Sequence, residues 1–326
     1  MIRNALPMSV LTSKISQSTA KLREQIKDTG SEAVTGRVSD ITKHLSGRVG
    51  QAMLGKKAID DLSNEMSLLQ LRKSRLDISQ QSLSHIQTSI SGLTVRAFDA
   101  VNFSNDSEIA TTARDAGLAL EGMLSTLNAR HGERFLFAGD ATSTAPFEGA
   151  DQLLADVEAI AAAATDAADL EASLDTYFND PAGDWQQNIY KGAQTASDSE
   201  ATLAIDPALT QIVRGLSVLA ISQPGGSVDA LGDSDTVRLS AANRLSAGET
   251  ALTDLRATIG IDQKRIADRT LDLEKEEITL VEAYALMTGR DQYEAASALK
   301  VLEANLEASY LLTARLSNLS LLNFLR

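Results

Sequence analysis

The chain contains no cysteine, few aromatic residues and only five prolines among its 326 residues. Without cysteine it has no disulfide bonds, no thiolate nucleophile and no cysteine-ligated zinc or iron–sulfur site. Aromatic residues make up 4% of the composition, which is unlike a compact, aromatic-rich enzyme core. No run approaches the roughly 18 apolar residues that a membrane span requires, and no secretory signal is recognisable. We therefore expect either a cytosolic protein or one exported without a cleaved signal.

Acidic residues are concentrated in one segment of the chain. The formal charge is −14 and the isoelectric point is near 4.7, which argues against nucleic acid as a partner because phosphates require a basic patch. Residues 140–206 contain 14 acidic side chains and one basic one, Lys191, so they carry −13 of this charge. Like charges at this density favour a solvent-facing position. The sequence thus predicts an acidic insert between two nearly neutral flanks.

The flanks have the pattern of long helices. Residues 8–145 and 225–326 contain no proline, and apolar residues repeat every seven positions from 62 to 90 and from 245 to 287. Strict sevens are typical of coiled-coil packing, with a bundle of ordinary amphipathic helices as the alternative. At 1.5 Å per residue, each stretch spans roughly 60–80 Å. The predicted packing seam consists of Leu62, Leu69, Leu76, Leu83, Ile90, Leu252, Ile259, Ile266, Leu273 and Leu280.

Both chain ends carry shorter apolar stripes. A lone amphipathic helix cannot bury its stripe and is marginal in water, so we expect the N-terminal helix to pair with the C-terminal one. The predicted terminal assembly residues are Leu11, Ile15, Leu22, Ile26, Leu302, Leu306, Leu316, Leu319, Leu322 and Phe324.

Shorter elements are expected between the long helices. The pattern predicts a helix over 107–131, capped by Asp106 or Ser107 and ended by Gly132, and then a short strand over 134–139. Within 140–231 it predicts a helix near 153–164, a strand over 201–205 and a helix that starts at Asp206 and Pro207. A small core of its own is expected from Phe147, Tyr177, Phe178, Trp185 and Tyr190.

Catalytic motifs are missing from the sequence. His131 and Glu133 match half of a zinc deaminase signature, but the other half requires cysteines. The sequence contains no zinc-protease, phosphate-loop or dinucleotide-binding motif, and its carboxylates lack calcium-loop spacing. These patterns predict that the chain is not an enzyme and that it holds no cofactor and no metal. The predicted fold is mainly α: a long antiparallel helical coiled-coil rod built from both chain ends, with a small β element and an inserted α+β domain at the tip.

Several short motifs together resemble the flagellin-like family, and most closely its hook-associated protein 3 branch, the hook–filament junction proteins. Thr35, Gly36 and Arg37 are similar to the turn that closes the N-terminal helix in flagellins. Residues 132–139 (GERFLFAG) resemble a signature of the junction proteins, as do the stretches 291–296, 307–310 and 316–326 and the pair Tyr190 and Gly192. The signature residues are Arg134, Phe135, Leu136, Phe137 and Gly139.

The resemblance implies a structural role outside the cell. Such proteins leave the cytoplasm unfolded through the flagellar type III apparatus and form a ring between hook-associated protein 1 and flagellin. Residues 1–40 and 289–326 would then pair in an inner-tube coiled coil, 41–139 and 232–288 would form the rod, and 140–231 would face outward. The implied partners are hook-associated protein 1, flagellin, neighbouring copies and a flagellar export chaperone. Filament flagellin itself and a cytosolic coiled-coil adaptor remain alternatives.

Overall fold

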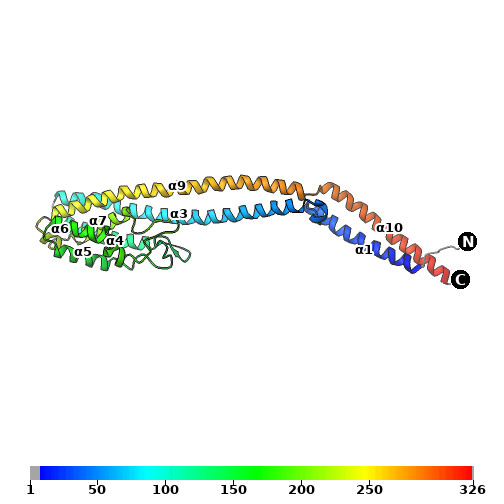
Figure 1. Cartoon of the computed structure of the whole chain (residues 1–326), viewed down its shortest axis with the longest axis horizontal. Coiled ribbons are helices and arrows are strands. Elements are labelled where there is room, and N and C mark those ends of the chain that lie inside the picture. Colours follow the sequence, from blue (N-terminus) through cyan, green and yellow to red (C-terminus); the bar gives the residue numbers. More distant parts are fainter. Residues whose placement is uncertain (1–7, 104, 325–326) are drawn as a thin grey trace. The chain divides into compact units, whose positions relative to one another are not determined.

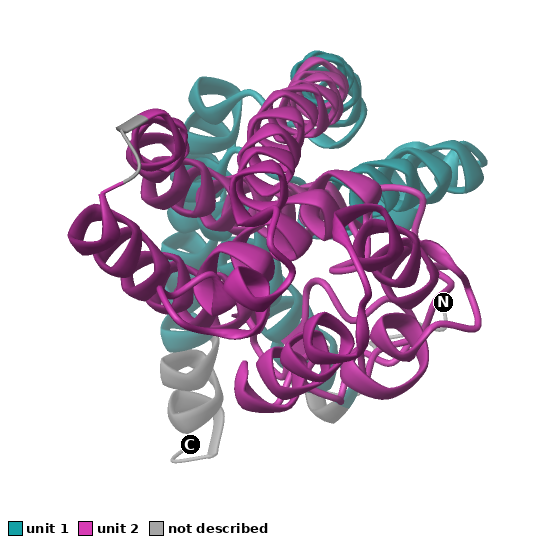
Figure 2. Cartoon of the chain, turned by 90° about the vertical axis from the view of Figure 1, so that its left-hand side faces the viewer, with its two compact units in different colours: residues 1–66, 271–326 teal, residues 67–270 magenta. Residues whose placement is uncertain are grey.

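A computed structural model describes residues 8–103 and 105–324 of the chain (Figure 1). The side chains from 10 to 315, except those of 11, 12, 103 and 104, are also described. The described residues form a mainly α fold with one two-stranded antiparallel sheet, as the sequence predicts. They divide into two compact units, coloured in Figure 2. Unit 1 comprises residues 1–66 and 271–326, and unit 2 comprises residues 67–270.

Unit 1 joins the two ends of the chain. It contains α1 (Met8–Thr35), α2 (Ile41–Leu45), the beginning of α3 (Val49–Phe103), the end of α9 (Ser234–Thr288) and α10 (Gln292–Phe324). Helices α1 and α10 are antiparallel, because Thr19 contacts Ser309 while Val34 contacts Gln292. Two amphipathic helices from opposite ends of the sequence thus cover each other's apolar stripes.

Unit 2 contains the rest of α3 and α9 with all of the shorter elements. These are α4 (Asp106–Leu127), β1 (Arg130–His131), β2 (Arg134–Phe135), α5 (Asp151–Ala163), α6 (Ala167–Asn179), the π-helical turn η1 (Trp185–Ile189), α7 (Pro207–Ile221) and α8 (Ser227–Ala230). Helices α4 to α7 gather beside one stretch of α3 and α9 (Figure 1). Unit 2 therefore packs the acidic insert and part of the predicted rod as one body.

Helix α7 lies at the centre of unit 2. Its residues from Ala208 to Ala220 are buried, apart from the half-buried Gln211. A Cβ atom at Gly215 would lie 3.0 Å from the carbonyl oxygen of Ala241 in α9. A Cβ atom at Gly248 of α9 would likewise lie 2.6 Å from Ile212. The two helix backbones approach this closely because each presents a glycine to the other.

Helix α4 and the strand after it differ from their predictions in their bounds. Helix α4 begins at Asp106 because the side chain of Asn105, and not of Asp106 or Ser107, accepts the capping hydrogen bond from the Ser107 amide at 3.0 Å. It ends at Leu127 with Asn128 as its C-cap, and Gly132, which has φ +62°, forms the hairpin turn instead of ending the helix. The strand predicted over 134–139 stops at Phe135.

The predicted strand over 201–205 is absent from this fully described part of the chain. The segment ends in a turn at 204–205 and makes one backbone hydrogen bond to the segment after the hairpin, from the Ala204 amide to the Phe137 carbonyl at 3.0 Å. A strand needs a ladder of such bonds, and none forms here. The regular elements of 140–231 are consequently helices, and this segment is not the α+β domain that was expected.

The aromatic core predicted for the insert is confirmed. The rings of Phe147 and Trp185 stack with centroids 5.2 Å apart, and Phe178 lies 5.6 Å from Trp185. Tyr177 meets Phe178 edge to face at 4.9 Å, and Tyr190 lies 6.0 Å from Phe147. Such contacts add about 0.5–1.5 kcal/mol per pair beyond the burial of apolar area.

Candidate assembly surfaces

The seam between α3 and α9 has a defined register in unit 2. Asp77 accepts a hydrogen bond from Gln263 at 2.7 Å, and Gln87 donates one to Thr253 at 3.0 Å. As the position on α3 rises by ten, its partner on α9 falls by ten, so the helices run antiparallel in a constant register. This register sets Leu83 opposite Ala257, two residues from the buried Ile259, and the same offset repeats one heptad to either side.

Most of the predicted seam residues are buried within their own unit. Nine of the ten are 9% exposed or less, and only Leu280 is half-buried. The buried members are Leu62, Leu69, Leu76, Leu83, Ile90, Leu252, Ile259, Ile266 and Leu273.

The terminal helix pair buries its stripe less completely. Ile15, Leu22, Ile26, Leu302 and Leu306 are half-buried between α1 and α10. Leu11, Leu316, Leu319, Leu322 and Phe324 lie outside the residues whose side chains are described.

One face of α10 is not covered by α1. Val301, Leu311 and Leu312 are more than half exposed there, although α1 lies against the helix. An apolar face of this size is a candidate contact for another subunit.

The predicted motif Thr35, Gly36 and Arg37 lies where α9 gives way to α10. Arg37 forms an isolated antiparallel bridge with Gly289, and the Arg290 amide donates to the Gly36 carbonyl at 2.9 Å. Gly36 has φ +65°, a left-handed conformation that favours glycine. The motif therefore stops α1 at the same level as the interruption between α9 and α10. The partner of this motif, Gly289, was not predicted, because a single glycine within a helical pattern does not by itself indicate a contact.

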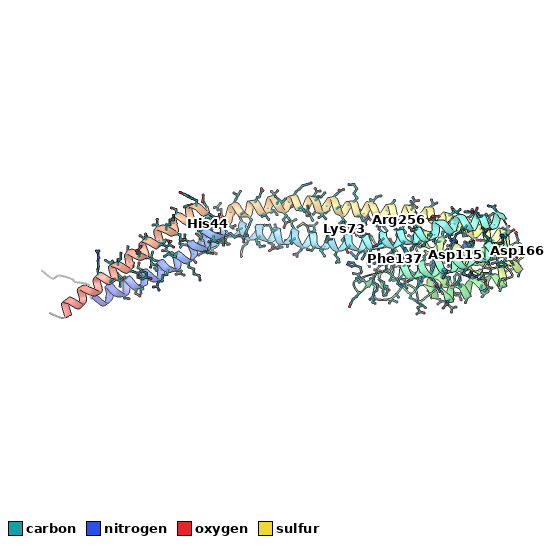
Figure 3. All side chains as sticks on the ribbon, turned by 180° about the vertical axis from the view of Figure 1, so that it is seen from behind. His44, Lys73, Asp115, Phe137, Asp166 and Arg256 are labelled. Atoms are coloured by element: carbon teal, nitrogen blue, oxygen red, sulfur yellow. The ribbon has the colours of Figure 1, made fainter. Side chains whose placement is uncertain are left out.

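The second motif forms a hairpin against α3. Arg130 pairs with Phe135 and His131 pairs with Arg134 across the turn at Gly132. The His131 ring lies 3.1 Å from the Ser74 hydroxyl on α3. Leu136 is half-buried. Phe137, labelled in Figure 3, is fully buried.

The motif at residues 132–139 meets the pair Tyr190 and Gly192, about 50 residues later in the sequence, at Gly139. The Tyr190 hydroxyl lies 3.2 Å from the Phe137 carbonyl and 3.0 Å from the Ala193 carbonyl, and its ring covers Gly192 so closely that no Cβ fits there. Gly139 has φ +61°, and a Cβ atom on it would lie 2.5 Å from the carbonyl oxygens of Ala193 and Thr195. Burial raises the pKa of Tyr190, so this hydroxyl remains a neutral donor. The hairpin and the insert are thus locked together by glycines and one buried tyrosine.

Buried arginines neutralise part of the acidic insert. Arg214 of α7 is 2% exposed and pairs with Glu171 and Asp175 of α6. Arg244 of α9 contacts the same Glu171 at 2.9 Å, and the Ser240 hydroxyl donates to it at 2.5 Å. The sequence contained one sign of this cluster, a single charged residue inside the apolar run of α7.

These contacts shift the acidity of the carboxylates. Burial raises the pKa of Glu171, but the hydrogen bonds from Ser240 and Arg244 and the charge of Arg214 bring it below its ordinary value. The pKa of Asp175 is lowered in the same way by Arg214 and Arg244 against an opposing effect of burial. Both groups therefore stay charged and hold α6 to α7 and α9.

The described residues lack a metal-binding cluster and a membrane-spanning helix. Between 8 and 324, apart from 104, no three His, Asp or Glu side chains gather in a way that could hold a metal ion. No helix in those ranges is long and apolar enough to cross a bilayer.

Comparison with known proteins finds a sequence match in the C-terminal part of the chain. Residues 245–325 match the family model of the bacterial flagellin C-terminal helical region. No curated protein matched the chain. Among solved structures, the crystal structure of Bacillus cereus FlgL is similar with a TM-score of 0.49 and 10% identity, over 72% of this chain and 99% of that chain. The part of α9 and α10 from Leu245 onward, about a quarter of the chain, is therefore similar in sequence to flagellin.

Proposed function

We propose that this chain is a structural subunit of the bacterial flagellum that joins hook-associated protein 1 to the flagellin filament. The observation that carries the proposal is the flagellin-like sequence of residues 245–325. It begins in the seam of α9 and continues through α10, the helix that pairs with α1. The match thus covers the helices whose apolar faces are available for assembly.

In this proposal each part of the chain has its own place. Residues 1–40 and 289–326 pair in the inner tube, residues 41–139 and 232–288 form the rod, and residues 140–231 face outward. The distribution of charge supports this order, because −13 of the net −14 falls in residues 140–206. Copies in a ring would repel one another if these faces met, since the Debye length is about 8 Å at physiological salt.

The proposed partners follow from the apolar ends. Hook-associated protein 1, flagellin and neighbouring copies would cover α1 and α10 after assembly. Before assembly, a flagellar export chaperone would shield the leucines near the C-terminus, Leu316, Leu319 and Leu322, during passage through the type III apparatus. Long apolar stripes of this kind are poorly tolerated in water without a partner.

Filament flagellin itself is the second candidate. The specific observation in its favour is that the matching family model describes a region of flagellin. Abundance separates the two candidates, because a filament subunit forms the bulk of the sheared flagella whereas a junction subunit is a minor component that stays with the hook.

The decisive experiment locates the chain and then removes it. We expect it in purified hook–basal bodies after the filaments have been depolymerised. Cells that lack it should retain hooks and secrete flagellin as unattached monomer. A chain found as the major filament protein would support flagellin instead, and a chain confined to the cytosol would support an adaptor.

A truncation and a matched replacement test the C-terminal end of α10. Removal of 317–326 should leave the melting temperature of the core unchanged and abolish filament attachment. Replacement of the same ten residues by a polar helical sequence of equal length is the control for mere shortening, and it should fail equally. Normal filaments on either strain would contradict the role of this end.

A further inference from the structure

A cavity in unit 2 lies between α9 and the segment that leads into α7. Its volume is about 340 Å³, which is within the range of small-molecule pockets in proteins. Leu203 and Pro207 line it on one side, and Leu255 and Ile259 of α9 line it on the other. Because these walls are apolar, the cavity suits a ligand that has a hydrocarbon part.

Three carboxylates line this cavity, and one of them has no cationic partner. Glu200 is paired with Arg72, and Asp262 is paired with Arg265, which also lies 4.0 Å from Glu200. Asp206 forms no ion pair with the part of the chain that the structure describes. Neither arginine lines the cavity. These five side chains together carry a charge of −1, which one monovalent cation would neutralise.

The position of Asp206 is fixed by its role as the cap of α7. Its Oδ1 atom accepts a hydrogen bond from the Ala208 amide at 2.9 Å. Burial nevertheless raises the pKa of Asp206 above its ordinary value, because this bond is its one stabilising interaction. A half-buried carboxylate of this kind is stabilised when a cation binds beside it.

A second, independent observation that indicates a ligand is the state of Thr202. This residue is 9% exposed and lines the same cavity. Its hydroxyl keeps some exposed surface and makes no hydrogen bond within residues 8–324, apart from 104. Buried hydroxyl groups normally have a hydrogen-bond partner. A donor bound in the cavity would supply the partner that Thr202 lacks.

The cation that suits these surroundings is organic. A divalent metal requires several carboxylates directed at one point, and no such group of three occurs between 8 and 324 with 104 left out. An alkylammonium ion combines a single positive charge and three hydrogen-bond donors with an apolar chain. Each of these properties has a counterpart in the walls of the cavity.

We propose that this cavity binds an alkylammonium ion, with its charge at Asp206 and the Thr202 hydroxyl and its alkyl chain against Leu255 and Ile259. The site lies wholly within unit 2. It does not depend on the flagellar assignment, so either proposal can fail while the other holds.

Ligand-detected NMR of the full chain with n-butylammonium at pH 7 tests the site. We expect saturable binding at one site per chain. The control ligand is 1-butanol, which has the same alkyl chain without the charge and should not bind measurably. A wild-type chain that shows no saturable binding of butylammonium would overturn the proposal, as would equal binding of butanol.

A substitution at the cap removes the charge and keeps the fold. Asp206→Asn retains a good capping residue and should weaken binding roughly tenfold or more, since a hydrogen bond to a charged group is lost. Asp166→Asn is the matched control, because Asp166 (labelled in Figure 3) caps α6 through the Asp169 amide and does not line the cavity. It should bind like the wild type. Equal affinities of the two variants would contradict the placement of the charge at Asp206.

Two further measurements complete the test. Thr202→Val keeps the shape of the side chain and should weaken binding a few-fold, because one hydrogen bond is lost. Unchanged binding would remove Thr202 from the site and overturn the proposal as stated. The source of the ammonium group is distinguished with Nα-acetyl-lysine amide. Tighter binding than that of butylammonium supports a lysine side chain of another protein, and weaker binding supports a free amine.

Discussion

Two glycines with the same backbone conformation have different surroundings. Gly132 and Gly139 have φ of +62° and +61°, but a Cβ atom at Gly132 would meet nothing within 4 Å. We expect Gly132→Ala to cost about 1–2 kcal/mol through left-handed strain alone. Gly139→Ala should cost roughly 1–3 kcal/mol more, because its Cβ must displace the backbone near Ala193. Chemical denaturation of the two variants measures the difference, and equal losses would show that the crowding at Gly139 is readily relieved.

A buried arginine provides a second test at the residue scale. Arg214→Met keeps an unbranched apolar stem but removes the guanidinium, so Glu171 and Asp175 have fewer partners. Removal of one member of a buried pair costs about 3–5 kcal/mol. Lys264→Met is the control, because Lys264 pairs with Asp268 at an exposed position, where such pairs contribute about 0–1 kcal/mol. The free energies of unfolding should separate the two variants clearly. Similar values would mean that Arg244 alone holds the cluster.

The same cluster predicts the effect of acid. The pKa of Glu171 is lower in the folded chain than in the unfolded one, where it is about 4.3. Its contribution to stability is therefore complete above that value and is lost as the pH falls through the folded pKa. Between pH 6 and pH 3, the melting temperature of Glu171→Gln should fall less steeply than that of the wild type. Parallel curves would assign the acid sensitivity to other carboxylates.

At the scale of elements, the seam determines whether α3 and α9 stay paired. Ile266→Asp places a charge at a position that is 2% exposed, at an expected cost of several kcal/mol. Ile261→Asp introduces the same charge five residues earlier on the same helix, at a position 67% exposed, and should be nearly neutral. Helical circular dichroism and melting curves distinguish the two. An unaffected Ile266→Asp variant would contradict the paired seam.

The elements differ in how well the sequence predicts them. The heptad repeats predicted long helices because period seven is a local property of each segment. The start of α7 was also predictable from the sequence, since Asp206 is a favourable N-cap residue and Pro207 follows it at the first helical position. The segment 201–205 was misread as a strand because its short apolar run is compatible with one, whereas in the fold it makes a single backbone hydrogen bond to Phe137 and no ladder. The approach of Gly215 to α9 depends on two residues distant in sequence, which no local pattern connects.

At the scale of the whole molecule, the burial of α7 predicts how removal of the insert changes the stability of the chain. Replacement of 142–229 by a Gly/Ser linker deletes a helix that is buried along almost all of its length. Leu120 and Leu245, both fully buried now, would face water. We expect a clearly lower melting temperature for this variant than for the chain without 317–326. A melting temperature equal to that of the wild type would show that the seam alone stabilises unit 2.

Figure 1 also shows the two ends of the chain side by side, in α1 and α10. The hydrogen bond between Thr19 and Ser309 joins residues 290 positions apart. A chain that is delivered from its N-terminus presents α1 first, and α1 then has no partner until nearly the last residue has arrived. Contacts of such long sequence separation form late. Unit 2 receives all of its residues by position 270, so the order of folding runs from the middle of the chain outward and closes at the ends.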